Sequence, residues 1–162
     1  MDNWKVIVGK GMAPGLLASL ASTAVLALFS KKEAGSPFAG ANAISHWLWG
    51  DRAFEQDRPT LKYTLVGYGI HHASSHFWGS IFEQLAGRVL GKKSPAATVA
   101  ASAAATAVAC VVDYKLTPKR FQPGFEQRVS RSSLAWVYVA FGVGLAAGAW
   151  LNHRHDDGAD LS

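Results

Sequence analysis

Charged residues are distributed very unevenly along this chain, and this distribution limits its possible folds more than any other feature. Only 17% of its 162 residues are Asp, Glu, Lys or Arg. Four windows of 19 to 21 residues contain none of them: 11–30, 63–82, 94–112 and 132–152. Each is close to the roughly 20 residues that a helix needs to cross about 30 Å of hydrocarbon. The pattern predicts an integral membrane protein and argues against a soluble or disordered chain.

The four windows predict an all-α fold, an antiparallel bundle of four transmembrane helices within a single integral membrane domain that spans the whole chain. We expect the transmembrane helices at about 11–30, 63–86, 94–113 and 132–152. The third of them is built almost entirely from Ala, Ser, Thr and Val. Small residues let helix backbones approach closely inside a membrane. We therefore expect this third helix at the buried centre of the bundle.

The fourth window contains a helix-packing motif. Gly144 and Gly148 have the G-x-x-x-G spacing, and Gly142 lies beside them. Glycines at this spacing allow close contact between membrane helices. The motif favours packing within one chain over a specific dimer, and it leaves a homo-oligomer or contact with another membrane protein open.

Two connections between the windows predict short interfacial helices, at about 41–58 and 114–131. The first holds Trp47 and Trp49 among charged residues, and the second places aromatic residues between basic ones and two prolines. Tryptophan and tyrosine concentrate where a membrane meets water. Both segments are therefore expected to contact lipid headgroups, which makes membrane lipids a predicted partner.

The basic residues indicate an orientation. The connections 31–62 and 113–131 hold 10 of the 16 Lys and Arg residues, and the opposite side holds 6. The positive-inside rule places the two longer connections in the cytoplasm and both termini on the opposite side of the membrane. The net charge of +5 does not predict a nucleic-acid partner, because the basic residues flank apolar windows rather than gather on one face.

The second window carries a polar stripe. Helical spacing of 100° per residue brings its polar and ionisable side chains, together with Gly79, to one face. The members of this stripe are Tyr68, His71, His72, Ser75, His76 and Glu83. Ionisable side chains at membrane depth are costly and usually face a bundle interior, where they find partners. This face is therefore the candidate site.

The stripe suggests a transition-metal site. His72 and His76 are spaced i, i+4 and can direct two imidazole nitrogens toward one ion, and Glu83 is a third candidate ligand. His46 and Asp113 are auxiliary candidates. Haem is the less favoured cofactor, because no other predicted span contains a histidine. His153 and His155 are placed in the polar tail. Asp113 is expected to pair with a nearby Lys or Arg, or to reach the stripe.

Two functions remain open. The favoured one is a structural or interaction role, in which the second helix lines the bundle interior with polar residues that hydrogen-bond to Ser, Thr or backbone groups of its neighbours. The alternative is a metal-, haem- or proton-handling protein that uses the His/Glu stripe. The chain contains no catalytic motif of a known enzyme class, and its single cysteine, Cys110, has no partner for a disulfide within the chain.

Three strings also support the membrane assignment: SHWLWGD at 45–51, IHHASSHFW at 70–78 and DYKLTPKRFQPGFE at 113–126. They resemble strings in a family of small multi-pass inner-membrane proteins of bacteria, and the resemblance covers most of the chain from about residue 40. It implies a bacterial inner-membrane location, which with the orientation above puts both termini in the periplasm, and it carries no activity with it.

Overall fold

The computed structural model describes residues 4–92 and 94–159, with side chains as far as Arg154. Within these ranges all regular structure is helical and there is no strand. Four long helices make up most of the chain: α1 (Trp4–Ala34), α4 (Val66–Leu90), α5 (Pro95–Val111) and α6 (Arg131–Ala159). The predicted all-α class is confirmed.

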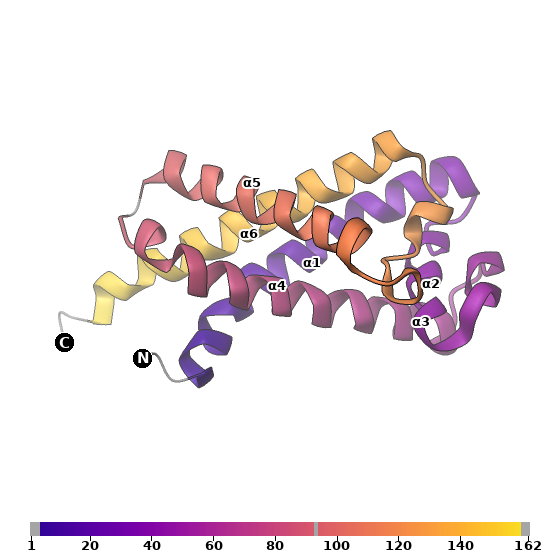
Figure 1. Ribbon diagram of the computed structural model, residues 1–162, viewed down its shortest axis with the longest axis horizontal. Coiled ribbons are helices and arrows are strands. Elements are labelled where there is room, and N and C mark those ends of the chain that lie inside the picture. The colour runs from indigo at the N-terminus through magenta and orange to yellow at the C-terminus, as the bar shows by residue number, and fades with distance from the viewer. Residues whose placement is uncertain (1–3, 93, 160–162) are drawn as a thin grey trace.

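The long helices lie side by side along the long axis of the molecule (Figure 1). Successive ones run in opposite directions, so that the start of α1, the end of α4 and the end of α6 share one end of the molecule. The short helices of the connections gather at the opposite end.

Three helical segments of the described chain are long and apolar enough to cross a membrane: Trp4–Ala34, Pro95–Leu116 and Arg131–Arg154. They indicate a membrane protein. The fourth predicted span forms the 25-residue helix α4, but its composition does not reach that of a membrane-crossing helix. The histidines, serines and glycines of its polar stripe lower its apolar content.

Both connections contain short helical segments at the predicted places. The first has α2 (Ala39–Ile44), α3 (His46–Trp49) and the 3₁₀ helix η1 (Gly50–Glu55), followed by the π-helical turn η2 (Leu61–Leu65) that leads into α4. The second has the π-helical turn η3 (Val112–Leu116) and the 3₁₀ helices η4 (Lys119–Phe121) and η5 (Phe125–Gln127). Hydrogen bonds join the two connections: the Trp47 indole donates to the Gln122 carbonyl over 2.8 Å, and Arg120 donates to the Trp47 carbonyl over 2.9 Å.

The central helix is α1, not the alanine-rich α5 that was expected there. α1 packs extensively against both α4 and α6, whereas α5 packs against the same two helices over a much smaller area of contact. On the outer face of α5, Val99, Val108 and Val111 are each more than half exposed. The expectation failed because α1 also has a surface of small residues, Gly11, Gly15, Ala18, Ser19 and Ser22, and this surface meets two neighbours at once.

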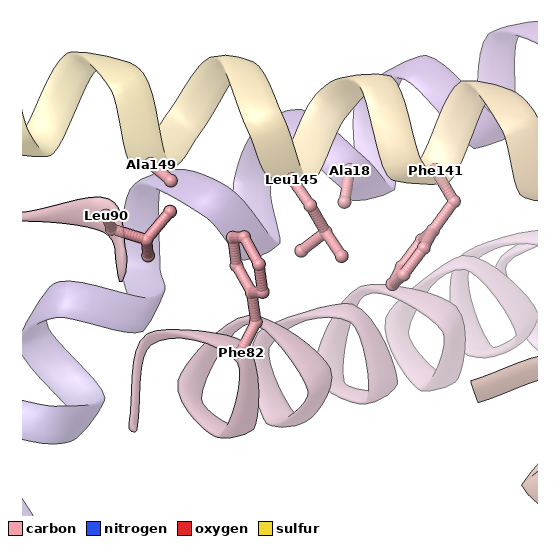
Figure 2. Close-up of a cluster of buried hydrophobic side chains, with 6 residues drawn as sticks. All are labelled: Ala18, Phe82, Leu90, Phe141, Leu145 and Ala149. Atoms are coloured by element: carbon pink, nitrogen blue, oxygen red, sulfur yellow. The ribbon is translucent and has the colours of Figure 1, made fainter. Parts of the chain in front are cut away.

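Two apolar clusters hold the long helices together. One lies between α1, α4 and α6, with Phe82 and Leu145 at its middle (Figure 2). The other lies toward the connections and joins Leu26, Ile44 and Phe125 to the first turns of α6. Along α4, the polar residues that face α1, at 71–76, lie between the part of the helix that packs against the second cluster and the part that contributes to the first. The candidate site is therefore flanked by packed apolar side chains.

Hydrogen bonds also fasten both ends of α1 to α6. Pro14, inside α1, has no N–H to donate to the carbonyl of Lys10 four residues earlier. The Asn152 side chain donates to that carbonyl instead, over 2.6 Å. At the other end, the Glu33 carboxylate accepts from the backbone N–H of Ser130, where the free N–H groups at the start of α6 favour a negative charge.

Candidate functional site

The polar stripe of α4 faces α1. Its Ser75 and Gly79 are buried, and the helices touch backbone to backbone. A Cβ atom added to Gly79 would lie 2.7 Å from the carbonyl oxygen of Gly11 and 2.7 Å from the backbone nitrogen of Gly15. This close approach brings the histidines of α4 within reach of the short serine side chains of α1.

His71 is hydrogen-bonded to a serine of α1. Its Nε2 lies 2.8 Å from Oγ of Ser22. The single hydroxyl proton of Ser22 is already directed at the carbonyl of Ala18, 2.6 Å away. His71 Nε2 must therefore donate to Ser22, and in a neutral imidazole the other nitrogen, Nδ1, is then an acceptor.

His72 and His76 form a connected pair. Their Nε2 atoms lie 3.0 Å apart, and Nδ1 of His72 lies 3.0 Å from Oγ of Ser19. Because two nitrogens at this distance share one proton, one imidazole donates to the other. The Tyr68 ring stacks on His72 with centroids 5.5 Å apart. The His76 ring lies against Gly15, where a Cβ would come within 2.6 Å of its Nδ1.

Glu83 belongs to a separate network near the ends of α4 and α6. It is 5% exposed, and its Oε2 lies 3.0 Å from Nε2 of His153, which is 9% exposed. Its Oε1 accepts from the Asn152 side chain over 3.1 Å. This network ties the end of α4 to α6 and, through Asn152, to the Lys10 carbonyl of α1.

The placement of His153 in a polar tail was wrong. The helix α6 continues through this residue, and Phe141, Leu145, Ala149 and His153 are all buried. These residues follow one another at intervals of four, so that the periodicity of the fourth window, extended into the charged tail, would have identified His153. The His155 side chain lies outside the described part of the chain.

The structure does not bring the five candidate metal ligands together. His72 and His76 adjoin each other, but Glu83 is bound to Asn152 and His153. His46 lies in α3, where its Nδ1 is 2.9 Å from the carbonyl oxygen of Ala43. Among the residues whose placement is described, no group of three or more His, Cys, Asp or Glu side chains is arranged to hold a metal ion.

Among the described residues, Asp113 forms no ion pair with a basic side chain and no hydrogen bond to the stripe. Its Oδ2 accepts a hydrogen bond from the hydroxyl of Tyr138 on α6, over 2.6 Å. The sequence did not indicate this partner, because Tyr138 lies inside an apolar window where its ring resembles any other packing residue.

The glycines of α6 lie against helices of the same chain. A Cβ on Gly144 would lie 2.4 Å from Cα of Ala18, and one on Gly148 would lie 2.4 Å from Cα of Pro14. Gly142 faces α5 instead, where a Cβ would lie 2.7 Å from Oγ1 of Thr106. The G-x-x-x-G surface is thus occupied by α1.

Comparison with protein-family models, with curated proteins and with solved structures finds no match to this chain.

Proposed function

We propose that this chain is a multi-pass protein of the bacterial inner membrane with a structural or interaction role, in which α4 is a fourth transmembrane helix and its polar stripe fastens it to α1. The observation that carries the proposal is the pairing of His71 and His72 with Ser22 and Ser19 of α1.

The position of α4 supports a membrane crossing. Residues 71–80 of α4 run directly along residues 11–22 of α1, as the contacts from Gly11 to Ser80 and from Ser22 to His71 show. A membrane that surrounds α1 therefore also surrounds α4. At 1.5 Å per residue its 25 residues extend about 37 Å, enough to cross a hydrocarbon core of about 30 Å.

The two faces of α4 differ in the way that a membrane helix requires. Several of its polar groups have partners within the chain, and the Ser75 and Ser80 hydroxyls donate to the carbonyls of His71 and His76 four residues earlier. Its exposed side chains are mostly apolar, with Phe77 61% and Leu85 80% exposed, and the exposed polar residues Gln84 and Arg88 lie near its end. This second face is suited to lipid tails.

The hydrogen-bonded series Ser19, His72 and His76 is buried at both ends, and this favours a structural contact over proton transfer. Ser19, at one end of this series, is 0% exposed, and Nδ1 of His76, at its other end, is fully buried without a hydrogen-bond partner. A relay needs a proton donor and a proton acceptor at its two ends. Two buried ends are instead what interhelical hydrogen bonding requires.

The positions of the two ends of the chain test the proposed fourth crossing. Four crossings place both ends on the same side of the membrane, whereas three crossings place them on opposite sides. We expect reporters fused to either end of the full chain to be active in the periplasm and inactive in the cytoplasm, because the more basic connections then lie inside. A C-terminal reporter active only in the cytoplasm, with the N-terminal one periplasmic, would refute the crossing by α4.

Elemental analysis and a visible spectrum of the detergent-purified protein test the structural role against metal or haem binding. We expect no stoichiometric transition metal and no Soret band, with the same result for a His72→Ala, His76→Ala variant. A metal or a Soret band that is present in the native chain and lost in this variant would contradict the structural role of the pair.

A further inference from the structure

A cavity of about 220 Å³ lies between α4, the end of α5, α6 and the two connections. The cavity lies beside the interface at which α4 is hydrogen-bonded to α1, and His71 and Ser22 belong both to that interface and to the cavity wall. Most of its walls are aromatic or aliphatic. The aromatic residues that line it are Trp47, Phe77, Trp78, Phe121, Phe125, Tyr138 and Phe141.

Two hydrogen-bond acceptors line this cavity, His71 and Asp113, beside hydroxyl groups such as that of Ser74 and the indole of Trp78. Nε2 of His71 is used in donating to Ser22, which leaves Nδ1 as an acceptor, and no hydrogen bond to Nδ1 is formed within the described chain. The Asp113 carboxylate accepts from the Tyr138 hydroxyl through one oxygen, Oδ2. Its other oxygen, Oδ1, receives no hydrogen bond from the described residues. These two acceptors favour a ligand that donates hydrogen bonds to them.

The charge of Asp113 is not balanced by an ion pair in the described part of the chain. No Lys, Arg or His side chain of the described residues forms an ion pair with it, although it lies within the apolar segment Pro95–Leu116. An ionisable side chain at membrane depth is expensive and is normally paired. The Tyr138 hydroxyl supplies one hydrogen bond but no compensating positive charge. A ligand that complements this site therefore carries a positive charge.

We propose that this cavity binds a small organic cation, a protonated or quaternary amine with a single-ring or similarly sized apolar body, through Asp113 and the surrounding aromatic rings. Aromatic faces attract a desolvated cation, and a carboxylate provides the counter-charge. His71 Nδ1 offers an additional acceptor for an N–H group of the ligand.

The size and exposure of the cavity limit the ligand further. An apolar protein cavity of about 150 Å³ holds one benzene molecule, so that about 220 Å³ accommodates one ring with a short ammonium arm. Two of its wall residues, Phe77 and Phe121, are 61% and 49% exposed, and the cavity therefore reaches the outer surface of the molecule. A ligand that has partitioned into the membrane can enter by that route.

Calorimetric titration of the detergent-purified full chain tests this proposal with two probes of the same shape, 2-phenylethylammonium and uncharged 2-phenylethanol. We expect the ammonium to bind at least about tenfold more tightly than the alcohol. Asp113→Asn removes the charge with little change of shape, and it should abolish this difference. The matched control Asp51→Asn changes an exposed carboxylate outside the cavity and should preserve it.

A second variant keeps the test decisive if Asp113→Asn does not fold. Ser74 lines the cavity and is partly exposed, so Ser74→Leu fills the space without altering the carboxylate. It should weaken the binding of both probes, and the fluorescence of Trp47 and Trp78, which line the same cavity, should no longer respond to the ammonium. Equal affinity for the two probes, no binding of either, or an ammonium preference that survives in Asp113→Asn would overturn the proposal.

Discussion

Replacing Gly15 by alanine should separate α1 from α4. A Cβ at this position would lie 2.6 Å from both Cα and Nδ1 of His76, whereas ordinary contact begins at 3.4 Å, so that α4 must retreat by about 0.8 Å. The same displacement stretches the His71–Ser22 bond from 2.8 to about 3.6 Å and the His72–Ser19 bond from 3.0 to about 3.8 Å. Neither distance is still a hydrogen bond.

The cost follows from these two effects. Overpacking a well-packed contact costs about 1–3 kcal/mol, and an interhelical hydrogen bond in a membrane protein contributes about 0.6 kcal/mol. We therefore expect Gly15→Ala to lower the free energy of unfolding by about 2–4 kcal/mol.

Titration of the micellar protein with sodium dodecyl sulfate, followed by far-ultraviolet circular dichroism, measures this loss. Gly9→Ala is the matched control, because Gly9 lies in the same helix and a Cβ there would meet nothing within 4 Å. It should be neutral or slightly stabilising, since alanine is the better helix former. Equal stability of the two variants would refute the close packing of α1 on α4 and, with it, the argument that α4 follows α1 through the membrane.

The same titration checks three other side chains. Glu83→Ala leaves the Asn152 and His153 side chains without their buried partner and should cost about 3 kcal/mol, and a loss below about 1 kcal/mol would mean that this network is dispensable. Phe82→Ala removes a side chain that is 2% exposed and should cost about 3–5 kcal/mol, against almost no loss for Phe77→Ala, whose ring is 61% exposed. Thr106→Val replaces a buried hydroxyl that has no hydrogen-bond partner by an isosteric methyl group, and it should raise stability by about 1 kcal/mol, so that a clear decrease would reveal a partner for this hydroxyl.

The long helices were predictable because hydrophobic length is a property of each segment alone. The uncharged windows at 11–30 and 132–152 lie within α1 and α6, and both helices extend beyond them. Charged residues at the ends of a helix do not end it, because long basic side chains reach water while the backbone stays helical. The charge pattern therefore underestimated the extent of α6, and His153 was misplaced for that reason.

Contacts between helices were less predictable, because they depend on which faces meet. The i, i+4 spacing of His72 and His76 was sufficient to expect them side by side. Nothing in the second window, however, indicated that their neighbour would be α1 and not α5. Nothing in the sequence distinguishes Ser19 and Ser22 from the other small polar residues of the same apolar window. Only the packing of the helices identifies them as partners of the histidines.

The close packing and the histidine contacts are one structural arrangement. A serine side chain is short, so it reaches an imidazole on the next helix only where the two backbones nearly touch, as they do at Gly11, Gly15 and Gly79. If the helices were separated by an ordinary layer of leucine side chains, the same histidines would be buried without partners, at a cost that a membrane makes larger. If α4 crosses the membrane as proposed, the small residues of α1 give its histidines partners there, and no metal is needed for that role.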